Sequence, residues 1–362
     1  MNQTKGLLYM TSIVVMTMLV FLAGCTSNSR TLPSATGSIY EVVVVADDNI
    51  YKDYIQPVMA ADMPCLPQME SYFHLSHVTA GQFDDFLKSA RNVLIVETSS
   101  DTTVKALYSR NRWSQPQAVC RITSPSQEAF GEWWQTGGEQ IRDWFVGEEM
   151  ARAARFLRGS TNKDAREALR NRLDCDMLIP EDYMLIKDTT DLVWCCNSKG
   201  SLRRDIIVYR YPYTDASQFT LSALCAKRDE VMGRTVSASV AGSYMGTEYN
   251  IFPPQMRSIQ PLAAHGYKAQ DGSFADYDGS FYGYEIRGLW RIFNGEAMGG
   301  PYVSHTRLDP VNGQIVTAEV FIYAAGQKKR NPLRQAESIL YTLQLPHERE
   351  KSSEQQMSCS SL

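Results

Sequence analysis

The chain has 362 residues, of which 44% are apolar, and a formal net charge of −4 at pH 7. That length and apolar content suffice for one large domain or two ordinary ones. The mildly acidic charge, without any long basic run, argues against a nucleic-acid-binding protein and against a polybasic lipid-binding patch.

The first 24 residues have the pattern of a bacterial lipoprotein signal peptide. Lys5 precedes an apolar run over residues 7–22, and the segment Leu-Ala-Gly-Cys ends at Cys25. That segment matches a lipobox, whose cysteine is acylated, and the apolar run is short for a spanning helix. We therefore expect acylated Cys25 to anchor the protein to a lipid bilayer. An ordinary secretory signal and an uncleaved membrane anchor are the alternatives.

Residues 25–38 are rich in Ser and Thr and predict a flexible tether. Residues 39–175 are then predicted to form an N-terminal α/β unit that ends in long helices. An apolar stripe runs along those helices, and Gly137 and Gly138 are expected to break or kink them. The expected strands are 39–46, 70–77, 92–98 and 117–122, and the expected helices are 50–59, 79–91 and most of 126–173.

Residues 176–346 predict a second unit of the α+β type, which follows a boundary near Pro180. The last segment, 347–362, is polar and expected to be disordered. Before the most aromatic part of this unit, strands are expected at 183–186, 191–196 and 205–211, with a helix near 217–232, and a last helix is expected at 333–343.

Residues 281–325 are the densest run of aromatic and β-branched residues, and they predict three antiparallel strands joined by two turns. Apolar side chains alternate with charged ones in the first strand. Asn294-Gly295 and Asn312-Gly313 are hairpin dipeptides that tolerate positive φ. Together these signals predict an α+β fold with two α/β-type sandwich units, each a mainly antiparallel sheet packed with helices, behind a lipidated N-terminal tether.

Familiar catalytic and metal-binding patterns are missing from the sequence. Besides Cys25 there are seven cysteines, an odd number without Cys-x-x-Cys spacing, which favours buried free thiols, although one or two disulfides remain open. No nucleophile elbow, zinc-protease motif, Walker loop or dinucleotide fingerprint occurs. We therefore expect no catalytic residue, metal or cofactor that a motif would reveal, and whether the protein is an enzyme stays open.

One group of residues mixes charges, an indole and an imidazole in and before the predicted meander. Its members are Glu248, Glu285, Arg287, Trp290, Arg291 and His305. If the strands pair as expected, such a group could bind a sugar or an acidic peptide. A sheet face closed by its own salt bridges is the alternative, and it is the one we favour.

The chain from Cys175 onward resembles the family called domain of unknown function 4837, lipoproteins of Bacteroidetes, and we expect the similarity to extend over nearly the whole mature chain. The segments that carry the resemblance are 178–195, 206–220, 242–249, 285–309 and 328–343, with RGLW and MGGPYVS the more specific parts. The resemblance implies an envelope lipoprotein of unassigned function with no catalytic residues to carry over. Surface-exported lipoproteins of that lineage tend to have acids after the acylated cysteine. Here Thr and Ser follow Cys25, which favours an outer-membrane location facing the periplasm.

Two classes of function follow. The favoured one is a non-enzymatic envelope module that binds or assembles with a protein or glycan partner. The alternative is a hydrolase acting on an envelope polymer through Glu285 or Glu248 with His305. An acid–base pair of that kind needs both side chains within reach of one substrate and at least one shifted pKa.

Overall fold

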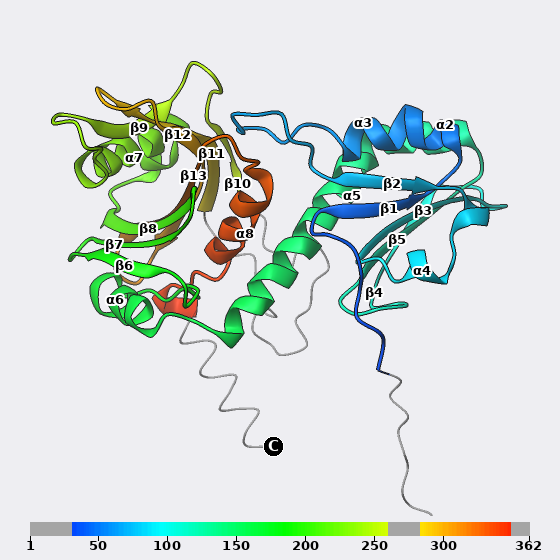
Figure 1. Cartoon of the computed structure of the whole chain (residues 1–362), viewed down its shortest axis with the longest axis horizontal. Helices are drawn as coiled ribbons and strands as arrows, with labels where there is room; N and C mark the ends of the chain where they lie inside the picture. Colours follow the sequence, from blue (N-terminus) through cyan, green and yellow to red (C-terminus); the bar gives the residue numbers. More distant parts are fainter. Residues whose placement is uncertain (1–30, 260–282, 349–362) are drawn as a thin grey trace, which may run out of the picture.

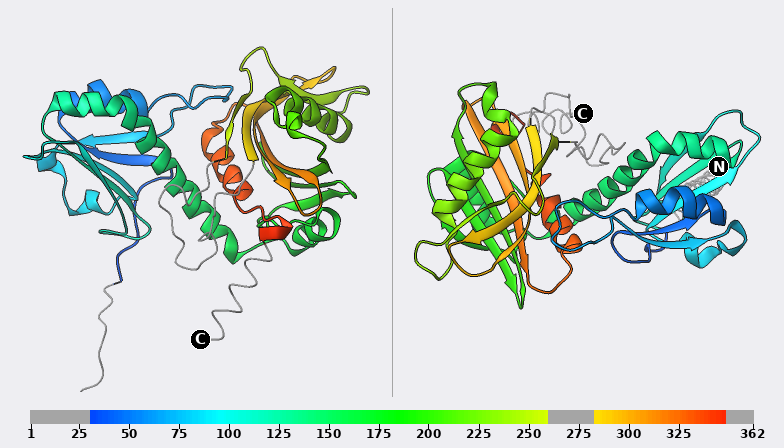
Figure 2. Two further views of the ribbon diagram at one scale, coloured as in Figure 1. Left: turned by 180° about the vertical axis from the view of Figure 1, so that it is seen from behind. Right: turned by 90° about the horizontal axis from the view of Figure 1, so that it is seen from above.

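The computed structural model describes residues 31–259 and 283–348. Two sheets lie side by side, each with its own helices, and the long helix α5 (Gln127–Phe156) runs from one to the other (Figures 1 and 2). The predicted α+β class with two sheets packed by helices is confirmed. Cys25, the expected acylation site, and most of the expected tail lie outside the described residues.

The first sheet has five strands in the order β2-β1-β3-β5-β4, and most of its neighbours are parallel. Only β4 pairs in the antiparallel direction. The expectation of a mainly antiparallel sheet is therefore wrong for this unit. Parallel neighbours need crossover connections, and short helices in the connections between β1, β2 and β3 serve that role. The strands are β1 (Glu41–Val45), β2 (His74–Val78), β3 (Asn92–Thr98), β4 (Lys105–Arg110) and β5 (Ala118–Ser124).

The helices of the first unit begin with a continuous helical run made of α2 (Asp48–Ile50), a π turn over 51–55 and α3 (Gln56–Met59). After α4 (Asp85–Lys88), α5 continues through both central glycines, so the expected break is wrong. A Cβ on Gly138 would lie 2.7 Å from the Trp134 indole. These glycines therefore give the tryptophan rings room along an unbroken helix.

The second sheet has eight strands, and every neighbouring pair is antiparallel, as predicted. The order is β10-β11-β12-β13-β8-β7-β6, and β9 also pairs with β11. The meander is confirmed as β11 (Gly283–Phe293), β12 (Gly299–Asp309) and β13 (Gln314–Ala324). The other strands are β6 (Met184–Asp188), β7 (Leu192–Lys199), β8 (Leu202–Pro212), β9 (Tyr244–Glu248) and β10 (Gln255–Ser258).

Helices cover both faces of the second sheet. On one face α6 (Lys163–Leu173) and α8 (Arg330–Leu340) pack over valines and alanines of β8, β12 and β13. On the other face α7 (Leu221–Thr235) covers an aromatic core that contains Trp290 and Tyr302. The meander therefore does not present an open sheet face to a ligand.

The first unit contacts the second through α5 and through the loop between α3 and β2. Met63 and Leu66 of that loop belong to the same apolar core as α8. The Glu70 carboxylate accepts hydrogen bonds from the backbone N–H groups of Lys329 (2.6 Å) and Arg330 (3.2 Å), at the start of α8. The first unit thus supplies the N-terminal cap of a helix that belongs to the second.

Six of the cysteines, from Cys65 to Cys225, are buried free thiols, as the sequence favoured. Cys359 lies outside the described residues. Within the described ranges, no three acidic, His or Cys side chains come together in a way that could hold a metal ion. Of the helices in those ranges, none combines the length and apolarity needed to cross a membrane.

Candidate functional site

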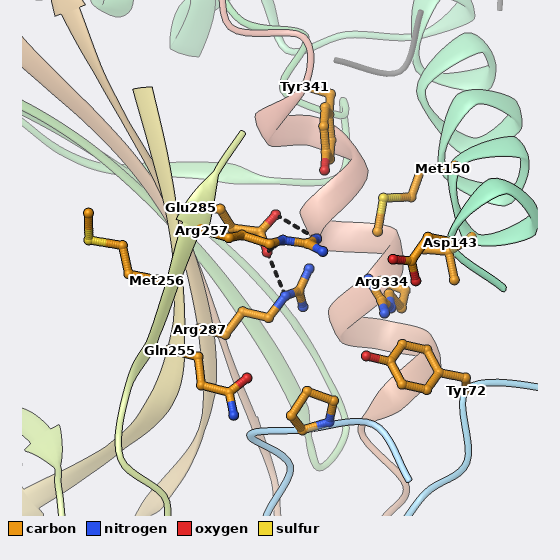
Figure 3. Close-up of a pocket in the computed structure, with 13 residues that line it drawn as sticks. Tyr72, Asp143, Met150, Gln255, Met256, Arg257, Glu285, Arg287, Arg334 and Tyr341 are labelled. Carbon is orange, nitrogen blue, oxygen red and sulfur yellow. Dashed lines mark hydrogen bonds and ion pairs between the residues drawn. The ribbon is translucent and has the colours of Figure 1, made fainter. Parts of the chain in front are cut away.

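A cavity of about 180 Å³ lies where the two units meet. Glu285 and Arg287, two of the predicted site residues, line it. Its walls come from the α3–β2 loop, α5, β10, β11 and α8 (Figure 3). Three arginines line it, Arg257 of β10, Arg287 of β11 and Arg334 of α8. We call this space the arginine cavity.

Glu285 is the anionic centre beside the arginine cavity. Strand alternation puts Glu285 and Arg287 on one face of β11, and strand register puts Arg257 and His305 directly opposite Glu285 on β10 and β12. The Nε atoms of Arg287 and Arg257 lie 2.7 and 2.8 Å from its Oε1. His305 Nε2 lies 3.4 Å from its Oε2. Both carboxylate oxygens of Glu285 are therefore occupied.

The charge of Glu285 is fixed by these neighbours. Burial alone would raise its pKa, but the charge of Arg287, the hydrogen bond with His305 and the charge of Arg257 hold the pKa well below its ordinary value. Glu285 and His305 are each only 1% exposed. A carboxylate that stays ionised and saturated is a structural counter-ion and a poor general acid.

Arg287 connects Glu285 to α8. Its Nη2 donates to the buried carboxylate of Glu337, which also accepts from Arg334 Nη1 at 3.1 and 3.2 Å. Its Nη1 is buried and has no hydrogen-bond partner among the described residues. Figure 3 shows the Arg287 guanidinium pointing into the arginine cavity, with Arg257 above it and Arg334 to its right in that view.

The structure divides the six predicted residues into three locations. Glu285, Arg287 and His305 come together beside the cavity, as described. Glu248 of β9 pairs instead with Arg291 farther along β11, at 3.1 Å.

Trp290, the sixth, points to the opposite face of β11. There it packs in the core that α7 covers, and its indole N–H donates to the backbone carbonyl of Ile322. The group expected to form one ligand face is thus not a single site.

Residues that sequence reasoning missed complete the cavity. Arg257 lies between the helix expected near 217–232 and the meander, at a position for which the sequence predicted no helix or strand. Glu337 and Arg334 lie on α8, whose buried apolar residues include Leu333 and Ala336. A usable signal was present, since Glu337 follows Leu333 by four residues and so falls on the buried stripe. A carboxylate in a buried stripe implies a cationic partner nearby.

Comparisons with known proteins place the chain in context. Two solved structures, the Ran-binding protein Mog1p of Saccharomyces cerevisiae and a point mutant of protein Mog1, are 8% identical to it, with TM-scores of 0.30 and 0.29. The matches cover 48% and 47% of this chain and 90% of each of those chains. At these scores the likeness supports no argument.

No curated protein matches the sequence. Residues 35–158 match the model of a domain of unknown function, DUF8532. The model of the domain of unknown function DUF4837 matches residues 162–342, half of the chain. The protein belongs to the DUF4837 family.

Proposed function

We propose that this protein is a lipoprotein of the bacterial envelope, anchored by acylated Cys25 to the outer membrane and facing the periplasm, and that its folded part is a non-enzymatic binding or assembly module. The lipobox and the Ser- and Thr-rich segment after it support the anchor and the location. A protein or glycan of the envelope is the partner that such a module would engage.

One observation carries the binding role. A cavity lined by both units holds a buried guanidinium whose Nη1 has no acceptor among the described residues. Ligand sites are commonly concave, lie between domains and contain a few well-placed polar groups. The arginine cavity has each of these properties, and it is bordered by Glu285 and Arg287, two of the residues singled out in the sequence.

The geometry weighs against the hydrolase alternative. Glu285 is ionised, saturated by three partners and buried, while His305 does not line the cavity. Glu248, the other candidate, pairs with Arg291 outside the cavity. Glu248 and His305 therefore do not face one substrate position, as acid–base catalysis requires.

Native mass spectrometry of the acylated protein, released gently from its own envelope, tests this proposal. We expect a stoichiometric complex with a protein or glycan, and we expect a Cys25→Ser variant to leave the membrane fraction. A bare monomer from several mild extractions, together with turnover of an envelope polymer by the purified protein, would replace the binding role with the enzymatic one.

A further inference from the structure

We infer that the arginine cavity is a binding site for one carboxylate group of a small organic ligand, held by Arg287 Nη1 together with Arg257 and Arg334. This inference rests on the proposed binding role and deepens it, because it names the chemical class that the module recognises. It starts from Arg287 Nη1, a buried donor of the charged cluster that the side chains of residues 31–259 and 283–348 leave unpaired.

The free donors converge on the same space. Arg287 is 7% exposed and gives Nε to Glu285 and Nη2 to Glu337, which leaves Nη1 without a partner in the described structure. Arg257 gives Nε and Nη2 to Glu285, and Arg334 gives Nη1 to Glu337. Both arginines thus retain N–H groups that make no hydrogen bond to the described residues. A buried donor without an acceptor is unusual in a native protein and asks for an explanation.

The charges around the cavity favour a monoanion. Three guanidiniums, those of Arg257, Arg287 and Arg334, face two carboxylates, those of Glu285 and Glu337. Asp143 also lines the cavity, but its carboxylate is paired with Arg142 at 3.0 Å. Counted over the described part of the chain, one positive charge is left over. A carboxylate would neutralise it, whereas a doubly charged phosphate would leave an excess of negative charge.

The chemistry of the donors points to the same class. Guanidinium N–H groups bind carboxylates through paired, charge-assisted hydrogen bonds. Tyr72, Met150 and Tyr341 line the remaining wall and offer aromatic and thioether surface to an organic body. A cavity of about 150 Å³ is large enough to bind benzene, so a cavity of about 180 Å³ has room for a small organic body. A small carboxylic acid, or the acidic end of a larger molecule, fits that space.

The test measures binding of sodium acetate and sodium benzoate to the acylated full chain in detergent micelles. Ligand-observed NMR would follow each titration at constant ionic strength, with sodium chloride as the balancing salt. We expect one saturable site per chain for at least one of the two carboxylates. Inorganic phosphate, at equal ionic strength, should bind at least tenfold more weakly.

Variants locate the site. Arg287→Met should weaken carboxylate binding at least tenfold, and Arg291→Met, an arginine of the same strand whose ion pair lies outside the cavity, should leave it unchanged. Because Arg287 is buried between two carboxylates, its replacement could unfold the chain. Arg257→Gln is the second variant, since this side chain is 48% exposed and still lines the cavity, and it should also weaken binding.

Each possible result of these measurements supports or overturns the inference. Phosphate binding without carboxylate binding would overturn the assignment of a carboxylate, and no saturable anion binding to the folded wild-type chain would overturn the site. Equal binding by the wild type and by Arg257→Gln would also overturn it. A partner captured by native mass spectrometry without anion binding would keep the binding module and reject this site. Anion binding without a captured partner would keep this site and reject the protein or glycan partner.

Discussion

Trp290 of β11 lies directly opposite Gly300 of β12, and its indole Nε1 donates to the Ile322 carbonyl at 3.2 Å. The same two strands hold the reciprocal pair, in which Tyr302 lies opposite Gly288. A Cβ on Gly288 would lie 2.7 Å from the tyrosine ring. In each pair a ring covers the backbone of a glycine, a known way to stabilise glycines in a sheet. These two pairs join the RGLW segment to the MGGPYVS segment across the hairpin.

Replacing Gly300 should therefore disrupt the meander. A Cβ there would collide with the backbone oxygen of Ile322, which cannot move without displacing β13. We expect Gly300→Ala to lower the free energy of unfolding by about 3 kcal/mol, measured by urea denaturation. Gly81→Ala is the control, because a Cβ at Gly81 meets no atom within 4 Å. Equal stability of the two variants would show that the close approach is not constraining.

Glu70 should stabilise the contact between the two units. Its carboxylate accepts the Lys329 and Arg330 N–H groups and also meets the positive end of the α8 dipole. We expect Glu70→Ala to cost about 1 kcal/mol in the free energy of unfolding and to speed hydrogen exchange in the first turn of α8. Asp85→Asn, whose side chain is 97% exposed, should change neither. Unchanged exchange in α8 after the Glu70 substitution would contradict the capping role.

The sequence predicted the turns and the side-chain alternation of the meander, but it did not predict how the strands of the first sheet pair. Asn294 and Gly313 have φ of 55° and 60°, the left-handed conformation that made their dipeptides good turn signals. Strand alternation likewise put Glu285 and Arg287 on one face. The direction of the first sheet could not be read in this way, because a buried strand such as residues 41–45 has the same pattern whichever way its neighbours run.

The candidate site likewise combines contacts that the sequence predicts with contacts that it does not. Glu285 and His305 meet because they occupy opposite positions in a hairpin that the sequence predicts. Arg334 and Tyr72 both line the arginine cavity only because the two units dock against each other. Contacts such as that of Glu70 with the start of α8 join residues more than 250 positions apart in the chain. No period or turn signal within one segment reports such a contact, so the cavity could not be assembled from the sequence.

The buried cysteines should react slowly in the native protein. Burial raises the pKa of Cys65 to about 11, although the charge of Arg287 acts against it, and burial raises the pKa of Cys120 to about 12. Compared with an ordinary thiol of pKa 9.0, Cys65 then has about 100-fold less of the reactive thiolate at a given pH. We expect peptide-resolved mass spectrometry to find both residues alkylated by iodoacetamide at least 100-fold faster in urea than in buffer. Rapid native alkylation of Cys65 would mean that the α3–β2 loop opens readily.

The stabilising effect of Glu285 should be lost in acid. Its pKa in the folded chain is held far below the ordinary 4.5, so its ion pairs contribute fully above that pH. As the pH falls below 4.5 toward the lowered folded pKa, the unfolded chain takes up the proton first and the contribution shrinks.

A Glu285→Gln variant checks that expectation, because it leaves Arg257 and Arg287 beside a neutral amide. We expect it to be about 3–5 kcal/mol less stable than the wild type at pH 7, which is the usual cost of breaking a buried ion pair. Unfolding measured from pH 7 down to pH 3 should show that difference narrowing below pH 4.5. Glu132→Gln, at an exposed position of α5, should match the wild type throughout. A difference that stays constant with pH would mean that Glu285 contributes through packing and hydrogen bonds and not through its charge.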